Sequence, residues 1–185
     1  MAHIQQQEFC LFVKNKYPTH FNNKKVLDCG SLDINGNNRY LFTQCEYLGI
    51  DVGIGNNVDI VVQINEFNYP DESFDTIIST ECFEHDMYYE KSLKNICRLL
   101  KSGGMFIFTC ATIGRPEHGT QRNSPNDSPL TSVIEEWSNY YKNLEEQNIR
   151  TAINIDNIFL EYQFSTRQYP FDLYFWGIKN SYDRL

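Results

Sequence analysis

The chain has 185 residues and a formal net charge of −8, since 24 acidic residues outnumber 16 basic ones. This balance argues against binding duplex nucleic acid through phosphate neutralisation. No apolar stretch reaches the ~18 residues that a membrane span requires, and the first nine residues, MAHIQQQEF, lack a secretory signal. A length of 185 residues suits one domain, over residues 1–185. The six cysteines lack paired metal-ligand spacing and several sit in apolar strand or helix patterns, so we expect buried free thiols and a reducing cytoplasm.

Residues 1–20 are predicted to form an N-terminal helical segment. Phe9, Phe12 and Val13 fall on one side of an amphipathic helix over residues 3–16, and Pro18 limits it. Such a helix either packs on the rest of the domain or forms a lid over a ligand, and the sequence leaves both readings open.

The stretch from Lys25 to Asp51 predicts a strand, a tight loop, a helix and a second strand. Gly30 and Ser31 break the first strand, and residues 37–44 have helical character. The N-terminus of that helix would offer free backbone N–H groups to an anion. Asp51 closes the second strand, about 20 residues on, where a carboxylate can accept hydrogen bonds from two ribose hydroxyls. The stretch therefore predicts a site for a nucleoside cofactor.

The following segments alternate between strands and helices, which implies a mostly parallel sheet. Strands are predicted at residues 58–65, 74–79 and 105–110, and Asp86 can cap a helix between the last two. The last third of the chain predicts a long loop at residues 111–130 and two short helices at 131–142 and 144–154. An antiparallel strand pair is predicted at 159–165 and 173–179.

Five motifs in this order resemble the class I S-adenosylmethionine-dependent methyltransferases, in particular the type 11 branch: VLDCGS, YLGID, PDESFDTIIS, the EH pair and LLKSGGMFIFT. The resemblance covers roughly residues 24–112. It implies a single methyltransferase domain and a Rossmann-like α/β fold, an open, mostly parallel seven-stranded sheet with helices on both faces and an antiparallel C-terminal strand pair. Two departures are Leu32 and Ile34, which stand where loop glycines are expected, and Gln63, which replaces a frequent acid.

The same resemblance implies S-adenosylmethionine as cofactor. Residues of the first loop would face its methionine end, Asp51 its ribose, Gln63 and Ile64 its adenine, and Thr80 with Glu81 its sulfonium. The full set of expected cofactor-binding residues is Asp28, Gly30, Ser31, Asn35, Arg39, Asp51, Val52, Gln63, Ile64, Asn65, Thr80 and Glu81.

Residues 111–145 are expected to bind the acceptor as a loop and helix. His85 and His118 are the first candidates for a catalytic base, should the acceptor have to lose a proton early. Further acceptor-side candidates are Arg115, Glu117, Trp137, Tyr140 and Tyr141, although aromatic spacing on a helix is also typical of core. We expect no metal site, because the four histidines share no ligand spacing with cysteines or acids.

The leading hypothesis is methyl transfer to an unidentified small-molecule or glycan-like acceptor. A catalytically silent binding subunit with the same fold is one alternative. An NAD-dependent oxidoreductase is a less favoured one, because the first strand is not followed by G-x-G-x-x-G. Nucleic acid and membrane partners are not expected, and the oligomeric state is left open.

Overall fold

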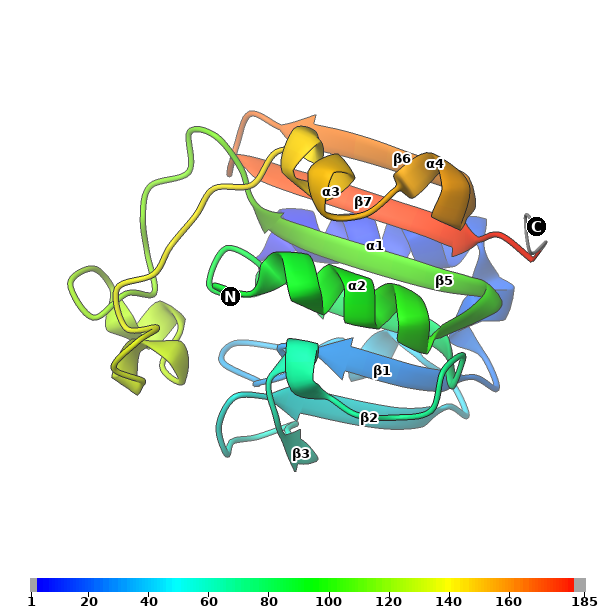
Figure 1. Cartoon of the computed structure of the whole chain (residues 1–185), viewed down its shortest axis with the longest axis horizontal. Coiled ribbons are helices and arrows are strands. Elements are labelled where there is room, and N and C mark those ends of the chain that lie inside the picture. Colours follow the sequence, from blue (N-terminus) through cyan, green and yellow to red (C-terminus); the bar gives the residue numbers. More distant parts are fainter. Residues whose placement is uncertain (1–2, 182–185) are drawn as a thin grey trace.

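The computed structural model describes residues 3–181, which form a seven-stranded sheet with helices on both faces (Figure 1). The strand order is β3-β2-β1-β4-β5-β7-β6. The first five strands run parallel, whereas β7 is antiparallel to β5 and to β6. The strands are β1 Lys25–Cys29, β2 Glu46–Asp51, β3 Ile60–Val61, β4 Phe74–Thr80, β5 Leu100–Ala111, β6 Phe159–Arg167 and β7 Asp172–Lys179. The fold class predicted from the sequence is confirmed.

The four α-helices lie on opposite faces of this sheet. Helix α1 (Ile4–Lys16) covers one face and buries Phe9 and Val13 against a cluster that includes Tyr174. Helices α2 (Tyr89–Leu99), α3 (Glu146–Ala152) and α4 (Ile155–Ile158) cover the other face. The N-terminal helix therefore packs on the domain.

The predicted helix over residues 37–44 is wrong, because only a 3₁₀ turn, Arg39–Leu41, forms between β1 and β2. The Asp33 carboxylate accepts hydrogen bonds from the Gly36 amide at 2.8 Å and from Asn37 Nδ2 at 2.7 Å. Such local side-chain bonds offer the backbone an alternative to helix. The expected helix N-terminus is consequently missing from the first loop.

Other predicted elements are shorter than expected. The strand at 58–65 is reduced to Ile60–Val61, and the helix at 131–142 to a 3₁₀ turn, Thr131–Val133. In that segment the Ser132 hydroxyl donates to the Pro129 carbonyl at 3.2 Å and the Ser138 hydroxyl to the Glu135 carbonyl at 3.0 Å. Serine and β-branched side chains disfavour helix, so the chain continues here as turns.

All six cysteines are free thiols, and four of them are buried as predicted, whereas Cys45 and Cys82 are half-buried. Within residues 3–181, every helix is too short or too polar to cross a lipid bilayer.

The interior of β2 leaves no room for a side chain at Gly49. A Cβ atom there would lie 2.2 Å from the Asn57 carbonyl oxygen and 2.7 Å from Ser31 Oγ. We expect Gly49→Ala to lower the free energy of unfolding by about 1–3 kcal/mol through overpacking, measured by urea denaturation. Glu46→Ala, on the same strand but exposed, is the control and should change stability by less than ~1 kcal/mol. Equal effects of the two substitutions would contradict this packing.

Candidate active site

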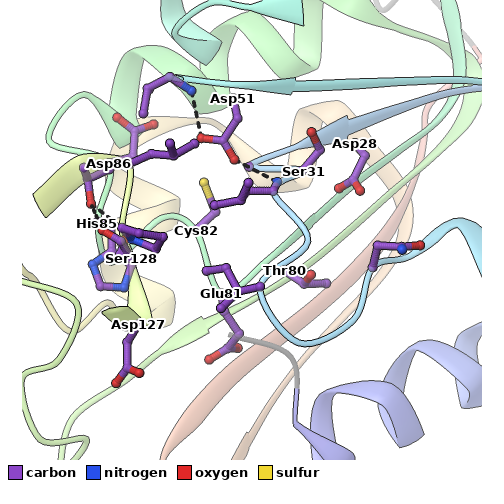
Figure 2. Close-up of a pocket in the computed structure, with 18 of the residues that line it drawn as sticks. Asp28, Ser31, Asp51, Thr80, Glu81, Cys82, His85, Asp86, Asp127 and Ser128 are labelled. Atoms are coloured by element: carbon purple, nitrogen blue, oxygen red, sulfur yellow. Dashed lines mark hydrogen bonds between the residues drawn. The ribbon is translucent and has the colours of Figure 1, made fainter. Parts of the chain in front are cut away.

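A pocket of about 880 Å³ lies at the carboxyl ends of β1, β2 and β4 (Figure 2). Parallel α/β sheets bind ligands at this edge. Residues of the first loop and of the end of β2 form one wall. The other wall comes from the loop after β4 and from a distant segment that contributes Asp127, Ser128, Pro129, Leu130, Thr131 and Trp137.

The first loop and the loop after β4 meet at Gly30. Its φ is +76°, in the left-handed region that favours glycine. A Cβ atom at this position would also lie 2.5 Å from Cys82 Sγ and 2.7 Å from Cys82 Cβ. Glycine is therefore required here on two counts, and its absent side chain lets the two walls of the pocket approach each other.

The Asp51 carboxylate closes β2 and anchors the first loop. One oxygen accepts a hydrogen bond from the Leu32 amide at 2.9 Å, and the other accepts one from the Val52 amide at 2.7 Å (Figure 2). Burial raises the pKa of Asp51 above its usual value, and the two amides act in the opposite direction. Each carboxylate oxygen has a second lone pair that can accept a further hydrogen bond.

Asp28, at the end of β1, is buried in a polar network below the first loop. It accepts hydrogen bonds from Asn38 Nδ2 at 3.3 Å and from the Tyr47 hydroxyl. Asn38 Nδ2 also donates to Thr80 Oγ1 at 3.1 Å, which joins the ends of β1 and β4. Burial raises the pKa of Asp28 to about 6, despite its two donors.

Glu81 follows β4 in a left-handed backbone conformation, with φ +53°. Its carboxylate accepts a hydrogen bond from Thr109 Oγ1 at 2.8 Å. His3, at the start of α1, places Nε2 2.9 Å from Asp172 and 3.5 Å from Glu81. Arg115 pairs with Asp172 at 2.8 Å. These contacts attach the N-terminal helix to the sheet edge beside the pocket.

Most of the expected cofactor-binding residues line the pocket together: Asp28, Gly30, Ser31, Asn35, Asp51, Val52, Ile64, Thr80 and Glu81. Gln63, Asn65 and Arg39 do not line it. The Arg39 guanidinium instead pairs with Asp59 at 2.9 Å and stacks on the Tyr47 ring. Whether any of these residues contacts a cofactor stays a prediction.

Sequence reasoning missed several lining residues, notably Asn38, Cys82 and Asp86. Asn38 was not predicted as a site residue, because it lines the pocket from a loop in a segment where the sequence predicts a helix. Cys82 and Asp86 lie within the polar TECFEHD stretch after β4, which did mark this edge of the sheet.

The expected acceptor residues separate into two groups. Trp137 lines the pocket, as does His85. Tyr141 lies outside the lining and packs on the rings of His85 and His118, with centroids 5.6 Å and 5.1 Å away. Arg115 forms a salt bridge with Asp172, and Glu117 forms one with Arg122 at 2.6 Å.

Of the two candidate bases, His85 is poorly suited to this role, whereas a catalytic role of His118 stays a prediction. Burial and the neighbouring His118 lower the pKa of His85 to about 3, and burial also lowers the pKa of His118. A base whose pKa lies far below the working pH has little driving force for proton transfer. Both histidines instead lie near Glu84, with one potential ligand atom of each of the three residues within 4.8 Å of the others. The spacing of the histidines in the sequence did not predict this group.

Comparison with known proteins agrees with this fold. The family model described as "Methyltransferase domain" matches residues 32–108. Phosphoethanolamine N-methyltransferase 2 of Haemonchus contortus superposes with a TM-score of 0.65 at 15% identity, over 92% of this chain and 52% of that one. The chain thus spans about half the length of the H. contortus enzyme. No curated protein sequence matches the chain.

A second solved structure matches this chain over nearly the whole length of both proteins. The 1,6-didemethyltoxoflavin-N1-methyltransferase of Burkholderia thailandensis superposes with a TM-score of 0.59 at 12% identity, over 97% of this chain and 92% of that one. Likeness at such low identity shows the fold. Together with the family match over residues 32–108, it shows that the chain has the fold of a methyltransferase domain.

The His3 contacts predict a pH-dependent stability. Burial lowers the pKa of His3, but hydrogen bonds to Asp172 and Glu81 outweigh it and raise the value from 6.5 to about 9. The resulting stabilisation is complete below pH 6.5 and is lost as the pH rises through 9. His3→Asn keeps a side chain able to cap α1 but removes the titrating ring.

We therefore expect His3→Asn to be less stable than the wild type at pH 6 and about equal to it near pH 10. The difference at pH 6 should be about 1–2 kcal/mol, below the full value of the pKa shift, because solvent screens a partly exposed ring. Urea unfolding at the two pH values measures it. A difference that stays constant with pH would show that His3 is not charged in the folded chain.

Proposed function

We propose that this chain transfers the methyl group of S-adenosylmethionine to a small-molecule acceptor held beside residues 127–137. The observation that carries the proposal is the pocket itself. It joins Asp51 and the first loop on one side to Thr131 and Trp137 on the other, so two ligands can lie against each other in one space.

The residues present fit the cofactor. Each Asp51 oxygen binds one backbone amide and keeps a lone pair, which suits the two hydroxyls of a ribose. Val62 and Ile64 add apolar lining for an adenine ring near the same end of the pocket. Gly30 keeps the loop backbone open toward the centre of the pocket, where a side chain would meet Cys82.

S-adenosylmethionine supplies a methyl group that its sulfonium already makes reactive. The contribution of the chain is then to orient the two ligands and to exclude water. Leu130 supports the second task, because its Cδ2 atom would lie only 2.8 Å from a Cβ atom built at Gly53. The segment that contains Leu130 thus reaches across to the end of β2 and covers the pocket.

The acceptor is proposed to be small. The H. contortus enzyme was solved with phosphomonomethylethanolamine and the B. thailandensis enzyme with 1,6-didemethyltoxoflavin, each together with S-adenosylhomocysteine. The net charge of −8 disfavours a nucleic-acid acceptor. The proposal places the protein in the cytoplasm, which the six free cysteines support.

Cofactor binding gives the first test of the proposal. S-adenosylhomocysteine at 100 times its Kd should stabilise the protein by about 2.7 kcal/mol, because it binds only the folded chain. A thermal melt with and without the ligand measures this, and NADH should produce no shift. Stabilisation by NADH but not by S-adenosylhomocysteine would overturn the proposal.

Replacement of Asp51 gives a second test. Asp51→Ala should weaken S-adenosylhomocysteine binding at least tenfold, since charge-assisted hydrogen bonds contribute about 1.5–3 kcal/mol each. Isothermal calorimetry compares the variant with Glu46→Ala, an exposed acid on the same strand that should bind like the wild type. Unchanged affinity of a folded Asp51→Ala protein would place the ribose elsewhere.

A further inference from the structure

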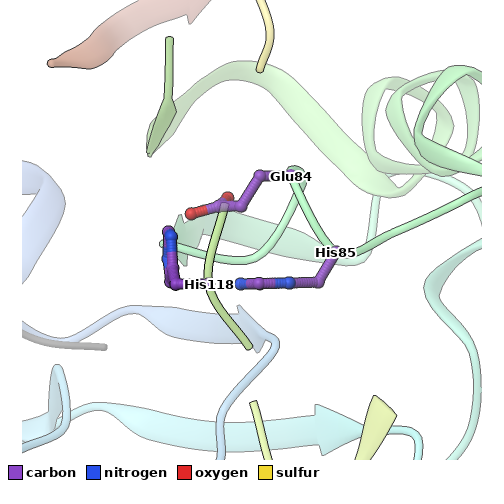
Figure 3. A group of neighbouring side chains, drawn as sticks. All are labelled: Glu84, His85 and His118. Carbon is purple, nitrogen blue, oxygen red and sulfur yellow. The ribbon is translucent and has the colours of Figure 1, made fainter. Parts of the chain in front are cut away.

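Glu84, His85 and His118 form a buried cluster at the edge of the pocket (Figure 3). Their exposed fractions are 0%, 4% and 8%. One potential ligand atom from each residue lies within 4.8 Å of the other two. Figure 3 shows the rings of His85 and His118 meeting edge to face, with the Glu84 carboxylate directed toward His118.

Five of the six side-chain polar atoms of this cluster lack hydrogen-bond partners among residues 3–181. This holds for both oxygens of Glu84, both ring nitrogens of His85 and Nε2 of His118. Buried polar groups are nearly always satisfied in folded proteins, and a buried carboxylate without a partner is strongly unfavourable. The three side chains are thus collected in one place, and no hydrogen bond between them satisfies these buried polar atoms.

The surroundings of the cluster hold the two imidazoles in place. His118 Nδ1 lies 3.1 Å from the Pro116 carbonyl oxygen, so an N–H at Nδ1 can donate there and leave the lone pair of Nε2 for the cluster. Metal-binding histidines are typically oriented by such a bond. Gly119 passes so close to His85 that a Cβ atom would lie 2.6 Å from its Cε1 atom.

A second group of similar composition consists of His3, Glu81 and Asp172. It differs from the first group in the compensation of its charges. Its charges are compensated within the described chain, because His3 lies 2.9 Å and Arg115 2.8 Å from Asp172. The group needs no cation to explain its burial. In contrast, no basic side chain of residues 3–181 forms a salt bridge with Glu84.

We propose that Glu84, His85 and His118 bind a divalent transition-metal ion, and that this ion holds an oxygen atom of the acceptor. Two imidazoles and one carboxylate are a ligand set that suits zinc and iron(II). Three protein ligands leave at least one coordination position for another molecule. His85 also lines the pocket, so that position lies next to the bound ligands. The part concerning the acceptor rests on the proposed function.

The ion would also join two parts of the chain. Glu84 and His85 precede α2, whereas His118 comes from the long segment after β5 that covers the pocket. Metal binding would therefore fix this segment against the sheet edge, and S-adenosylhomocysteine binding at the Asp51 end should not require it.

Cobalt(II) is a direct probe, because its visible absorption reports coordination by protein ligands. The full-length protein is stripped with a chelator and titrated with cobalt chloride, alongside Glu84→Gln, His118→Ala and His20→Ala. The last variant removes a histidine that lies outside both clusters. We expect one ion per chain in the wild type and in His20→Ala, and at least about tenfold weaker binding in the other two. Equal binding by all four proteins, or none by the wild type, would overturn the proposal.

Thermal melts separate loss of the metal from loss of the fold. Zinc should raise the Tm of the wild type and of His20→Ala but not that of Glu84→Gln. Without metal, Glu84→Gln should be at least as stable as the wild type, since it removes an uncompensated buried acid. A zinc-induced shift in Glu84→Gln equal to that of the wild type would contradict the site.

The open position is tested with acetohydroxamate, a small ligand that binds metals through oxygen. It should change the visible spectrum of the cobalt-loaded wild type, and an unchanged spectrum would overturn the part concerning the acceptor. Calorimetry with S-adenosylhomocysteine is run on the same samples. Failure of that ligand to bind would reject the proposed function while leaving the metal result intact, so the two claims fail separately.

Discussion

The hydrogen bonds of the Asp51 carboxylate to the Leu32 and Val52 amides organise the cofactor end of the pocket. Without a helix between β1 and β2, the first loop depends on side chains for its conformation. Asn57 provides a second support, because its Nδ2 donates to the Ser31 carbonyl at 2.7 Å and its own carbonyl accepts from Ser31 Oγ at 3.0 Å. The same acid shapes the loop and, in the function we propose, presents lone pairs to the ribose. The stability of the site would then be coupled to its recognition of the cofactor.

At the opposite end of the pocket, the main physical constraint is that buried carboxylates need positively charged partners. Glu81 and Asp172 lie beside His3 and Arg115, so their charges are balanced by residues from α1 and from the segment after β5. Glu84 has no such partner within residues 3–181, and burial with the nearby Glu81 charge raises its pKa to about 8. A carboxylate in this setting either stays protonated or binds a cation. The unpartnered oxygens of Glu84, close to two imidazoles in one buried cluster, are the geometric basis for the proposed metal site.

The mostly parallel sheet and the edge that carries the pocket could be predicted from the sequence, because apolar runs such as residues 74–79 and 105–110 mark buried parallel strands. Asp51 could be predicted for the same reason, since its place follows from the strand that precedes it. Asn38 could not, because Asp33 turns the loop away from the helix that its sequence suggests. The meeting of His118 with Glu84 depends on how residues 111–130 fold back onto the sheet edge, and no local pattern encodes that contact.

The most direct measurement is a crystal structure of the full-length protein with S-adenosylhomocysteine. We expect both ribose hydroxyls to lie within hydrogen-bond distance of the Asp51 carboxylate. We also expect the sulfur to lie toward Thr80 and His85, facing the segment that contains Thr131 and Trp137. A ligand bound in this pocket with its ribose away from Asp51, or with its adenine against His85, would contradict the proposed function.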